Sequence, residues 1–170
     1  KANAYGLGAI DIARGINTQN IQYFGVATIN EAIELREAGI TTPLFLLSEP
    51  NESDFMELIN YSITSTVYQH TTITKLNQFA KQQNYHISTH LKIDTGLSRL
   101  GVPWDKAPSI IEYWGNQTHL KTEGIYTHLI ASESPKHPCN NIQIDRFQSI
   151  LKNNTLPITY HHCANSAAID

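Results

Sequence analysis

Six short β-rich runs alternate along the chain with stretches of helical spacing, and this alternation limits the fold more than any other feature. The runs lie at residues 23–28, 44–48, 63–68, 87–94, 124–129 and 158–163. A repeated strand-then-helix unit predicts a parallel sheet covered by helices. The run LFLLS at 44–48 is almost continuously apolar, which is typical of a strand buried on both faces of such a sheet.

The helical stretches carry their own start and stop signals. After the first run, Thr28 and Glu31 fit a capping box, and Gly39 can adopt the left-handed conformation that ends a helix. Farther along, apolar residues spaced by three, four or seven predict helices around 55–59, 73–80 and 144–151. We expect a helical stretch after each predicted strand, and four of these stretches carry the signals named above.

This pattern alone fits both an open doubly wound sheet and an incomplete eight-stranded barrel. Polar residues fall at or just after the carboxyl ends of successive strands, namely Lys1, Lys92, Asp94, Arg99, His128, His162 and Asn165. In a barrel those ends converge on one mouth, whereas the outer strands of an open sheet lie too far apart to share a site. We therefore predict an α/β fold of the (β/α)8 TIM-barrel type, incomplete, with about seven of its eight strands, one of them ending at Lys1.

Composition narrows the classes of partner. The chain has 170 residues, 41% of them hydrophobic, which suits a single globular domain. Its formal charge of -3 gives no basis for binding nucleic acid or an acidic membrane surface, and favours a small-molecule partner. No apolar run approaches the roughly 18 to 20 residues that span a bilayer, so we expect a cytoplasmic protein. Cys139 and Cys163 are predicted to be free thiols.

Four strings of residues resemble one enzyme family. A glycine turn such as the one after Lys1 is weak evidence when it stands alone. The strings KANAYGLG (1–8), HLKIDTGLSRLGV (90–102), GIYTHL (124–129) and HHCANSAA (161–168) occur in order over almost the whole chain. Together they resemble the barrel domain of alanine racemases, which use pyridoxal 5'-phosphate. The resemblance implies that residues 1–170 are a partial cofactor-binding barrel domain and that a C-terminal β domain lies outside the sequence.

The resemblance also implies roles for individual residues. Lys1 would hold the cofactor covalently and then act as a base on one face of the substrate carbon, because a lysine amine released from the cofactor aldehyde stands beside the proton to be removed. Tyr5 would bind the cofactor phosphate. Arg99 would contact the phenolic oxygen, and His128 would lie against the face of the pyridine ring.

Three further residues complete the predicted site. Asn165 and Ser166 match residues around the phosphate, and Ser166 is predicted to begin a helix whose free amides would favour an anion. Lys92 matches a lysine that is carbamylated in many members of the family. A carbamate would turn a cation beside Arg99 into an anion that can hold the guanidinium in place.

The remaining histidines are given no catalytic role. His161, His162 and Cys163 are adjacent, and neighbours on a strand point to opposite faces, so we predict no metal site there. The others are expected to be surface or cap residues, namely His70, His86, His119 and His137.

The chain departs from the family pattern near the expected site. Ser98 stands where glycine is usual, Leu97 where methionine is common, and LIASES follows His128 in place of the frequent Phe-Ala and acidic residues. In the family, the second base is a tyrosine of the β domain contributed across a homodimer, and both it and the arginine at the pyridine nitrogen would lie beyond Asp170. We therefore expect the segment alone to be inactive, and its open sheet edges to favour aggregation unless it is part of a larger chain.

Several functions remain open at this stage. The leading hypothesis is interconversion of L- and D-alanine by two-base proton exchange at the α carbon, which would supply D-alanine for peptidoglycan. A serine or broad-specificity racemase would use the same lysine. A non-catalytic pyridoxal-phosphate-binding barrel would lack the β domain, and a decarboxylase of basic amino acids fits the strings at 94–101 and 162–168 poorly.

Overall fold

A computed structural model describes residues 2–16 and 21–169 of the chain. The helices are α1 (Ala2–Tyr5), α2 (Ala9–Gly15), α3 (Ile29–Glu37), η2 (Glu52–Asp54), α4 (Phe55–Asn60), α5 (His70–Gln82), α6 (Ala107–Gly115), α7 (Pro138–Asn153) and η3 (Ser166–Ala168). The strands are β1 (Phe24–Val26), β2 (Leu44–Leu46), β3 (Ile63–Val67), β4 (Ile87–Asp94), β5 (Val102–Pro103), β6 (Leu120–Tyr126) and β7 (Tyr160–His162).

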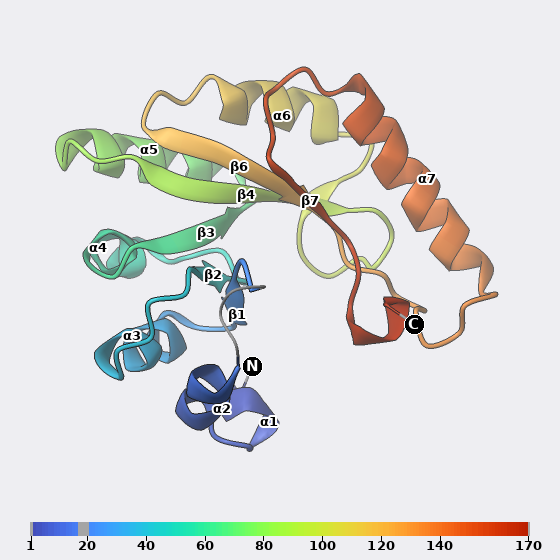
Figure 1. The fold of residues 1–170 in the computed structure, drawn as a ribbon. Helices are drawn as coiled ribbons and strands as arrows, with labels where there is room; N and C mark the ends of the chain where they lie inside the picture. The colour runs from blue at the N-terminus through green and yellow to red at the C-terminus, as the bar shows by residue number, and fades with distance from the viewer. Residues whose placement is uncertain (1, 17–20, 170) are drawn as a thin grey trace.

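The strands form one parallel sheet that curls into a half-barrel (Figure 1). Its order is β1-β2-β3-β4-β6-β7, with the two-residue β5 paired to β4 beside this path. Each long strand thus pairs with the next in sequence, as in a barrel, and no reversal of strand order marks an open doubly wound sheet. The predicted incomplete barrel is confirmed.

The described residues form seven strands, the number that was predicted, but they are not the same seven strands. All six β-rich runs contain a strand, whereas the strand expected to end at Lys1 lies outside the described residues. β5 was not predicted, because two residues leave no periodic signal. β6 was predicted at 124–129 and begins earlier, at Leu120, because pairing of Leu120 with Ile87 of β4 extends it backwards despite Lys121.

The predicted helix signals are present at both ends of α3. The Thr28 side chain accepts a hydrogen bond from the Glu31 amide, and the Glu31 carboxylate accepts one from the Ala27 amide at 2.7 Å. The second bond of the box therefore reaches one residue farther back than in the usual pattern. Gly39 has a φ of +83°, the left-handed conformation expected at the helix end.

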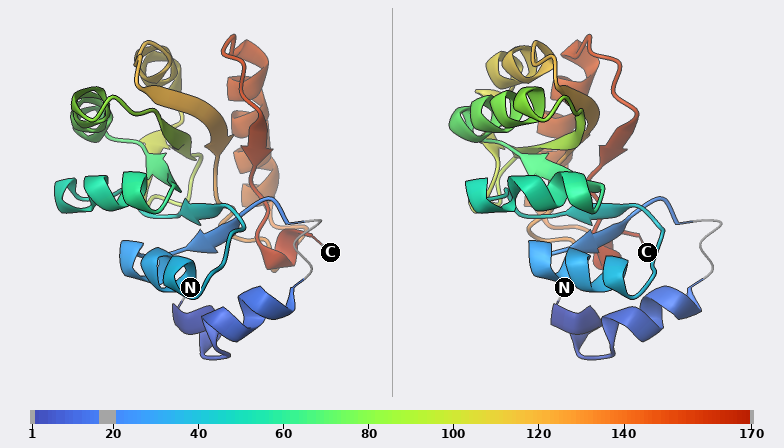
Figure 2. Two further views of the ribbon diagram at one scale, coloured as in Figure 1. Left: turned by 60° about the vertical axis from the view of Figure 1, so that its left-hand side comes forward. Right: turned by 90° about the vertical axis from the view of Figure 1, so that its left-hand side faces the viewer.

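The core lies between the convex face of the sheet and the helices that cover it (Figure 2). Along β4, Ile87, Leu91 and Ile93 are buried in this core, and along β2 Leu44 and Leu46 are buried there too. Leucine, isoleucine, phenylalanine and tryptophan side chains of the helices pack against them, among them Leu35, Leu58, Ile73, Leu76, Trp114 and Phe147.

The concave face carries a different set of side chains. Residues one position out of phase with the core, such as Phe45, His90, Lys92 and Tyr126, line the inside of the half-barrel. In the described residues β1 and β7 each have a single neighbour in the sheet, so this inside is open between them. Within the described part of the chain, no helix is long and apolar enough to cross a membrane.

Candidate active site

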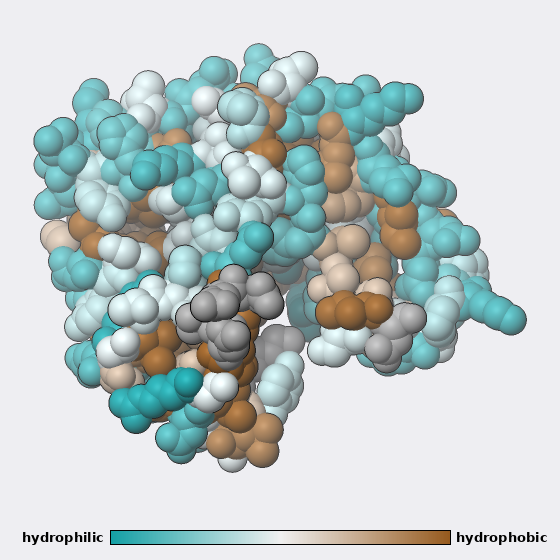
Figure 3. Space-filling view, in the orientation of Figure 1, coloured by the Kyte–Doolittle hydropathy of each residue, from teal (hydrophilic) through white to brown (hydrophobic). Residues whose placement is uncertain are grey.

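The inside of the half-barrel is a cavity of about 970 Å³. It opens as a hollow between the part of the molecule built by the N-terminal helices and the part that ends at the C-terminus (Figure 3). Five of the predicted site residues line it, and they come from the carboxyl ends of three different strands, namely Lys92, Arg99, His128, Asn165 and Ser166. Such convergence is expected where the carboxyl ends of strands meet at the mouth of a barrel.

Two other residues that the sequence singled out do not lie in the cavity, and a third is outside the described residues. Lys1, the predicted cofactor lysine, is outside the described residues. Tyr5 is 76% exposed in α1, where the backbone is left-handed, and it does not line the cavity. Asp94 also stays out of the cavity, because its carboxylate accepts hydrogen bonds from the amides of Gly96 and Ser98 and so shapes the loop that carries Arg99.

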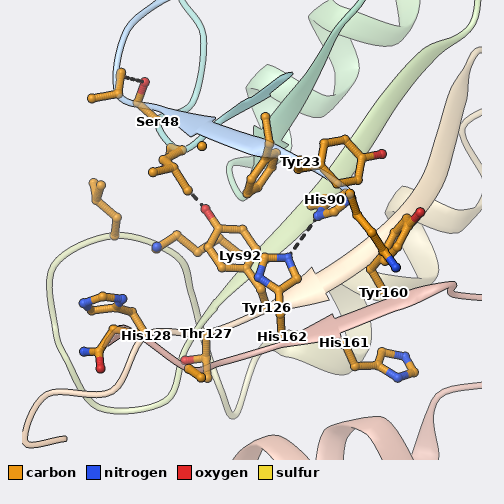
Figure 4. Close-up of a pocket in the computed structure, with 18 of the residues that line it drawn as sticks. Tyr23, Ser48, His90, Lys92, Tyr126, Thr127, His128, Tyr160, His161 and His162 are labelled. Atoms are coloured by element: carbon orange, nitrogen blue, oxygen red, sulfur yellow. Dashed lines mark hydrogen bonds between the residues drawn. The ribbon is translucent and has the colours of Figure 1, made fainter. Parts of the chain in front are cut away.

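Lys92 is buried inside the half-barrel, with only 6% of its surface exposed. Its Nζ lies 4.4 Å from the centroid of the Tyr126 ring (Figure 4). The Tyr126 hydroxyl in turn lies 2.9 Å from the Thr66 hydroxyl, and burial raises its pKa above the ordinary range. A lysine in this position sits in the wall of the cavity, whereas a surface lysine would reach solvent.

Asn165 and Ser166 stand where β7 gives way to the last helical turn. The Asn165 Oδ1 accepts a hydrogen bond of 2.7 Å from the Ser132 hydroxyl, which joins this turn to the loop after His128. Ser166 is exposed at the start of η3, a single 3₁₀ turn of three residues. The predicted helix start is thus present, as a short turn within the described residues.

Two histidines meet inside the half-barrel: His162, expected at a strand end but given no chemical role, and His90, which was not singled out from the sequence. The His90 Nδ1 and His162 Nε2 atoms are 3.0 Å apart, so one nitrogen donates to the other. Burial, helped by the neighbouring His162, lowers the pKa of His90 to about 3. Burial lowers the pKa of His162 to about 4, with Lys92 and His161 adding to the effect. Both rings are therefore neutral at pH 7.

A glycine makes room for this pair. The register of β4 and β6 shifts between Thr89 and His90, which places Gly124 opposite His90. A Cβ atom at Gly124 would lie 2.5 to 2.7 Å from three atoms of the His90 ring, closer than any real contact. The buried histidine therefore requires glycine at position 124.

Alternation along the strands could have identified His90 and Tyr126 as site residues from the sequence. His90 and Lys92 are two apart, as are Tyr126 and His128, and Tyr160 and His162. Residues two apart on a strand share a face. Because Lys92 and His128 were assigned to the site, their partners two positions earlier belonged to the same face.

No metal centre stands out in the described residues, where no group of three or more His, Cys, Asp or Glu side chains is placed to hold an ion. His161 is exposed and points away from His162 (Figure 4). Cys139 and Cys163 are free thiols, as predicted.

Comparison with known proteins places the chain in a family. The sequence profile described as "Alanine racemase, N-terminal domain" matches residues 1–169. The chain belongs to this family. As an alanine racemase N-terminal domain it is 37% identical to alanine racemase 1 of Caldanaerobacter subterraneus, with 99% of this chain and 45% of that protein covered. It is 38% identical to the alanine racemase of Fusobacterium nucleatum, covering 99% of this chain and 47% of that protein.

Solved structures agree with this assignment. An alanine racemase of Clostridium difficile 630, in complex with cycloserine, superposes with a TM-score of 0.92 at 32% identity over 99% of this chain and 47% of that one. A histidine racemase from Leuconostoc mesenteroides superposes with a TM-score of 0.88 at 23% identity, a likeness of fold. The N-terminal domain described here thus spans about half the length of the curated relatives that it matches.

Proposed function

We propose that the parent protein is a pyridoxal-phosphate-dependent alanine racemase and that residues 1–170 form its cofactor-binding barrel segment. The observation that carries this proposal is the convergence of Lys92, Arg99, His128, Asn165 and Ser166 on one cavity, in a chain of the alanine racemase family. The 45% to 47% coverage of the relatives fits a protein that works with a further domain.

The donor groups suit the chemistry of the cofactor, which carries a phosphate, a phenolic oxygen and a flat ring. Arg99 offers a guanidinium to an oxygen anion. Ser166 offers a hydroxyl, and Asn165 can offer its Nδ2 amide because its Oδ1 already accepts from Ser132. A cavity of about 970 Å³ is ample for a molecule of this size.

The residues of this chain would have separate roles in cofactor binding and in proton transfer. When bound, pyridoxal phosphate withdraws electrons from the α carbon of an amino acid. Lys1 would hold the cofactor covalently and then take or return the α proton on one face. Tyr5 and Ser166 would bind the phosphate, Arg99 the phenolic oxygen, and His128 the ring face. A tyrosine of the second domain would act on the opposite face, so that the configuration inverts.

Lys92 lies in the wall of the cavity, where its proposed carbamylation would replace a cation with an anion. The reaction adds carbon dioxide to the neutral amine, forming an N–C bond with loss of a proton. The resulting anion would lie in the same cavity wall as Arg99. Native mass spectrometry of the full-length protein should show the added mass of one carbon dioxide, lost in Lys92→Gln.

Three parts of the proposal concern the whole protein. Homodimerisation would bring the second base to the cavity, and the product D-alanine would serve peptidoglycan synthesis. The cytoplasmic location remains a prediction from the sequence.

The decisive experiment tests Lys1 in the full-length protein. Borohydride treatment with pyridoxal phosphate should fix the cofactor to the peptide that contains Lys1, and Lys1→Ala should abolish both fixation and racemisation. Lys81→Ala, a change at an exposed lysine of α5, is the matched control. Fixation that persists in Lys1→Ala contradicts the assignment.

Kinetics on two substrates test the choice of amino acid. Turnover of alanine should exceed turnover of serine in the full-length enzyme. The opposite order would favour the serine or broad-specificity racemase, whose preference would arise from the altered segment after His128.

A further inference from the structure

One face of α7 is directed at two loops that border the cavity. The first, the Arg99 loop, is residues 95–101 between β4 and β5, and the second, the His128 loop, is residues 127–137 between β6 and α7. Asn140, Gln143 and Arg146 follow one another at intervals of three, which places them on one side of the helix. All three donate hydrogen bonds to these loops.

Gln143 is the centre of this arrangement and only 1% of its surface is exposed. Its Oε1 accepts a hydrogen bond of 2.9 Å from the Ile130 amide. Its Nε2 donates to the His128 carbonyl and to the Thr95 hydroxyl, both at 3.1 Å. One side chain thus bonds to the His128 loop twice and to the Arg99 loop once, and three of its four hydrogen-bonding positions are used.

The same network extends to the cavity wall. The Thr95 hydroxyl, which accepts from Gln143, lies 2.7 Å from the hydroxyl of Thr127, a residue that lines the cavity. The Arg146 Nη1 donates to the Thr95 carbonyl at 2.7 Å. Both threonines are buried, so these bonds are made away from water, where the loss of one partner is costly.

Asn140 holds a more distant part of the His128 loop. Its Nδ2 donates to the carbonyls of Ala131 and Ser134, both at 3.0 Å. Both bonds go to the His128 loop, so Gln143 is the amide side chain that joins the two loops in the described part of the chain.

We infer that Gln143 is a positioning residue that sets the spacing between Arg99 and His128 for the cofactor. The inference rests on the proposed function, because it takes these two residues as the cofactor's contacts. Gln143 does not line the cavity, so it acts through the two loops. Without it, cofactor binding would have to order both loops, and ordering loose segments lowers affinity.

The test compares variants of the full-length protein in cofactor titrations. Gln143→Met keeps the volume of the side chain and removes all three bonds, and should weaken pyridoxal phosphate binding by about tenfold or more. Gln143→Glu keeps an acceptor for the Ile130 amide and loses the amide donors, so its affinity should fall between wild type and Gln143→Met. Hydrogen exchange should quicken in both loops of Gln143→Met.

The control is Ile150→Val, which alters a buried side chain near the C-terminal end of the same helix. It should lower thermal stability and leave cofactor affinity and loop exchange unchanged. Gln143→Met that binds the cofactor as tightly as wild type overturns the inference, as does a loss of affinity that Ile150→Val reproduces. If the wild-type protein takes up no cofactor, the proposed function fails and the inference falls with it.

Discussion

Predicted cofactor residues lie in two regions of the molecule. One region is the set of loops after β4, β6 and β7, and the other is the segment at the start of the chain. The two regions differ in where they lie relative to the cavity. The loops converge on the cavity, and side chains of α7 donate hydrogen bonds to the loops after β4 and β6. In α1, Tyr5 is exposed and outside the cavity. Each of the three loops follows a strand paired in the sheet, whereas α1 contacts α2.

The difference shows what positions a site in this fold. A paired strand fixes where its carboxyl end points, and a loop that leaves that end has little freedom left. The side of the half-barrel built from β4, β6 and β7, called here the anchored side, has this support. The segment 2–8 contacts α2, its neighbour in sequence, and the Asn3 Oδ1 accepts a hydrogen bond from the Ala9 amide at the start of that helix.

The largest expected effect tests the packing of the anchored side. Gly124→Ala would drive a Cβ into the His90 ring and should lower the free energy of unfolding by about 3 kcal/mol. Gly25→Ala in β1 is the matched control, because its Cβ meets only the side chain of Leu47 at 3.3 Å, and it should cost about 1 kcal/mol or less. Urea unfolding of both variants measures this, and equal costs would show that the His90 side is no tighter than the β1 edge.

The next effect is a dependence of stability on pH. The pKa values of His90 and His162 fall from 6.5 to about 3 and about 4 in the folded protein, so the unfolded chain binds more protons between these values. Stability should therefore be full above pH 6.5 and fall as the pH drops towards 4, with a slope of about 1.4 kcal/mol per pH unit for each histidine. Carboxylates add their own slope at the acid end.

Replacement of one ring isolates the histidine contribution. His162→Gln should remove about half of the histidine slope between pH 4 and pH 6.5 and leave the part that comes from His90. Phe45→Leu, which changes a ring packed against His90 without removing a titrating group, should keep the wild-type slope. A slope equal to that of the wild-type protein in His162→Gln would mean that this ring is not held neutral on the anchored side.

A smaller effect concerns the Arg99 loop. Ser98, which stands where the family usually has glycine, has a φ of +56°. This conformation costs an L-residue roughly 1 kcal/mol, so Ser98→Gly should raise the free energy of unfolding by about 0.5 to 1 kcal/mol.

Ser62→Gly supplies the control for this prediction. Ser62 has a φ of +50° and follows α4, away from the cavity-lining residues. It should gain similar stability, and only Ser98→Gly should alter cofactor affinity in the full-length protein. A loss of stability in Ser98→Gly would contradict the claim that the backbone is strained at Ser98.

The smallest expected change tests the other side of the comparison. Tyr5→Phe should shift the stability of the chain by less than about 0.5 kcal/mol, because the residue is exposed. In the full-length protein the same change should weaken cofactor binding if Tyr5 reaches the phosphate. Unchanged cofactor affinity would remove Tyr5 from the site.

The fold was predictable to the extent that its signals are local and periodic. Thr28 and Gly39 marked the ends of α3, and the apolar runs marked six strands. β5 was not predicted because two residues are too short to show a periodic pattern. The start of β6 was not predicted because Leu120 belongs to the strand only through its pairing with Ile87. Such pairing is a contact between distant parts of the chain.

The site was predictable through residues at strand ends, and five of them share the cavity. The role of Gln143 was not predicted, because a glutamine on an amphipathic helix is ordinarily a solvent-facing residue. The His90–His162 contact spans 72 residues and depends on the space left by Gly124, so no window of sequence contains it.

The sequence by itself determined the alternation of strands and helices, the parallel barrel that follows from it, and the chemistry gathered at the strand ends. The tertiary structure decided which side chains are buried together, that two histidines are neutral, and that α7 ties the Arg99 and His128 loops to each other. The physical reason is range. Periodicity and capping act within a few residues, whereas desolvation and buried hydrogen bonds exist only after distant segments have packed.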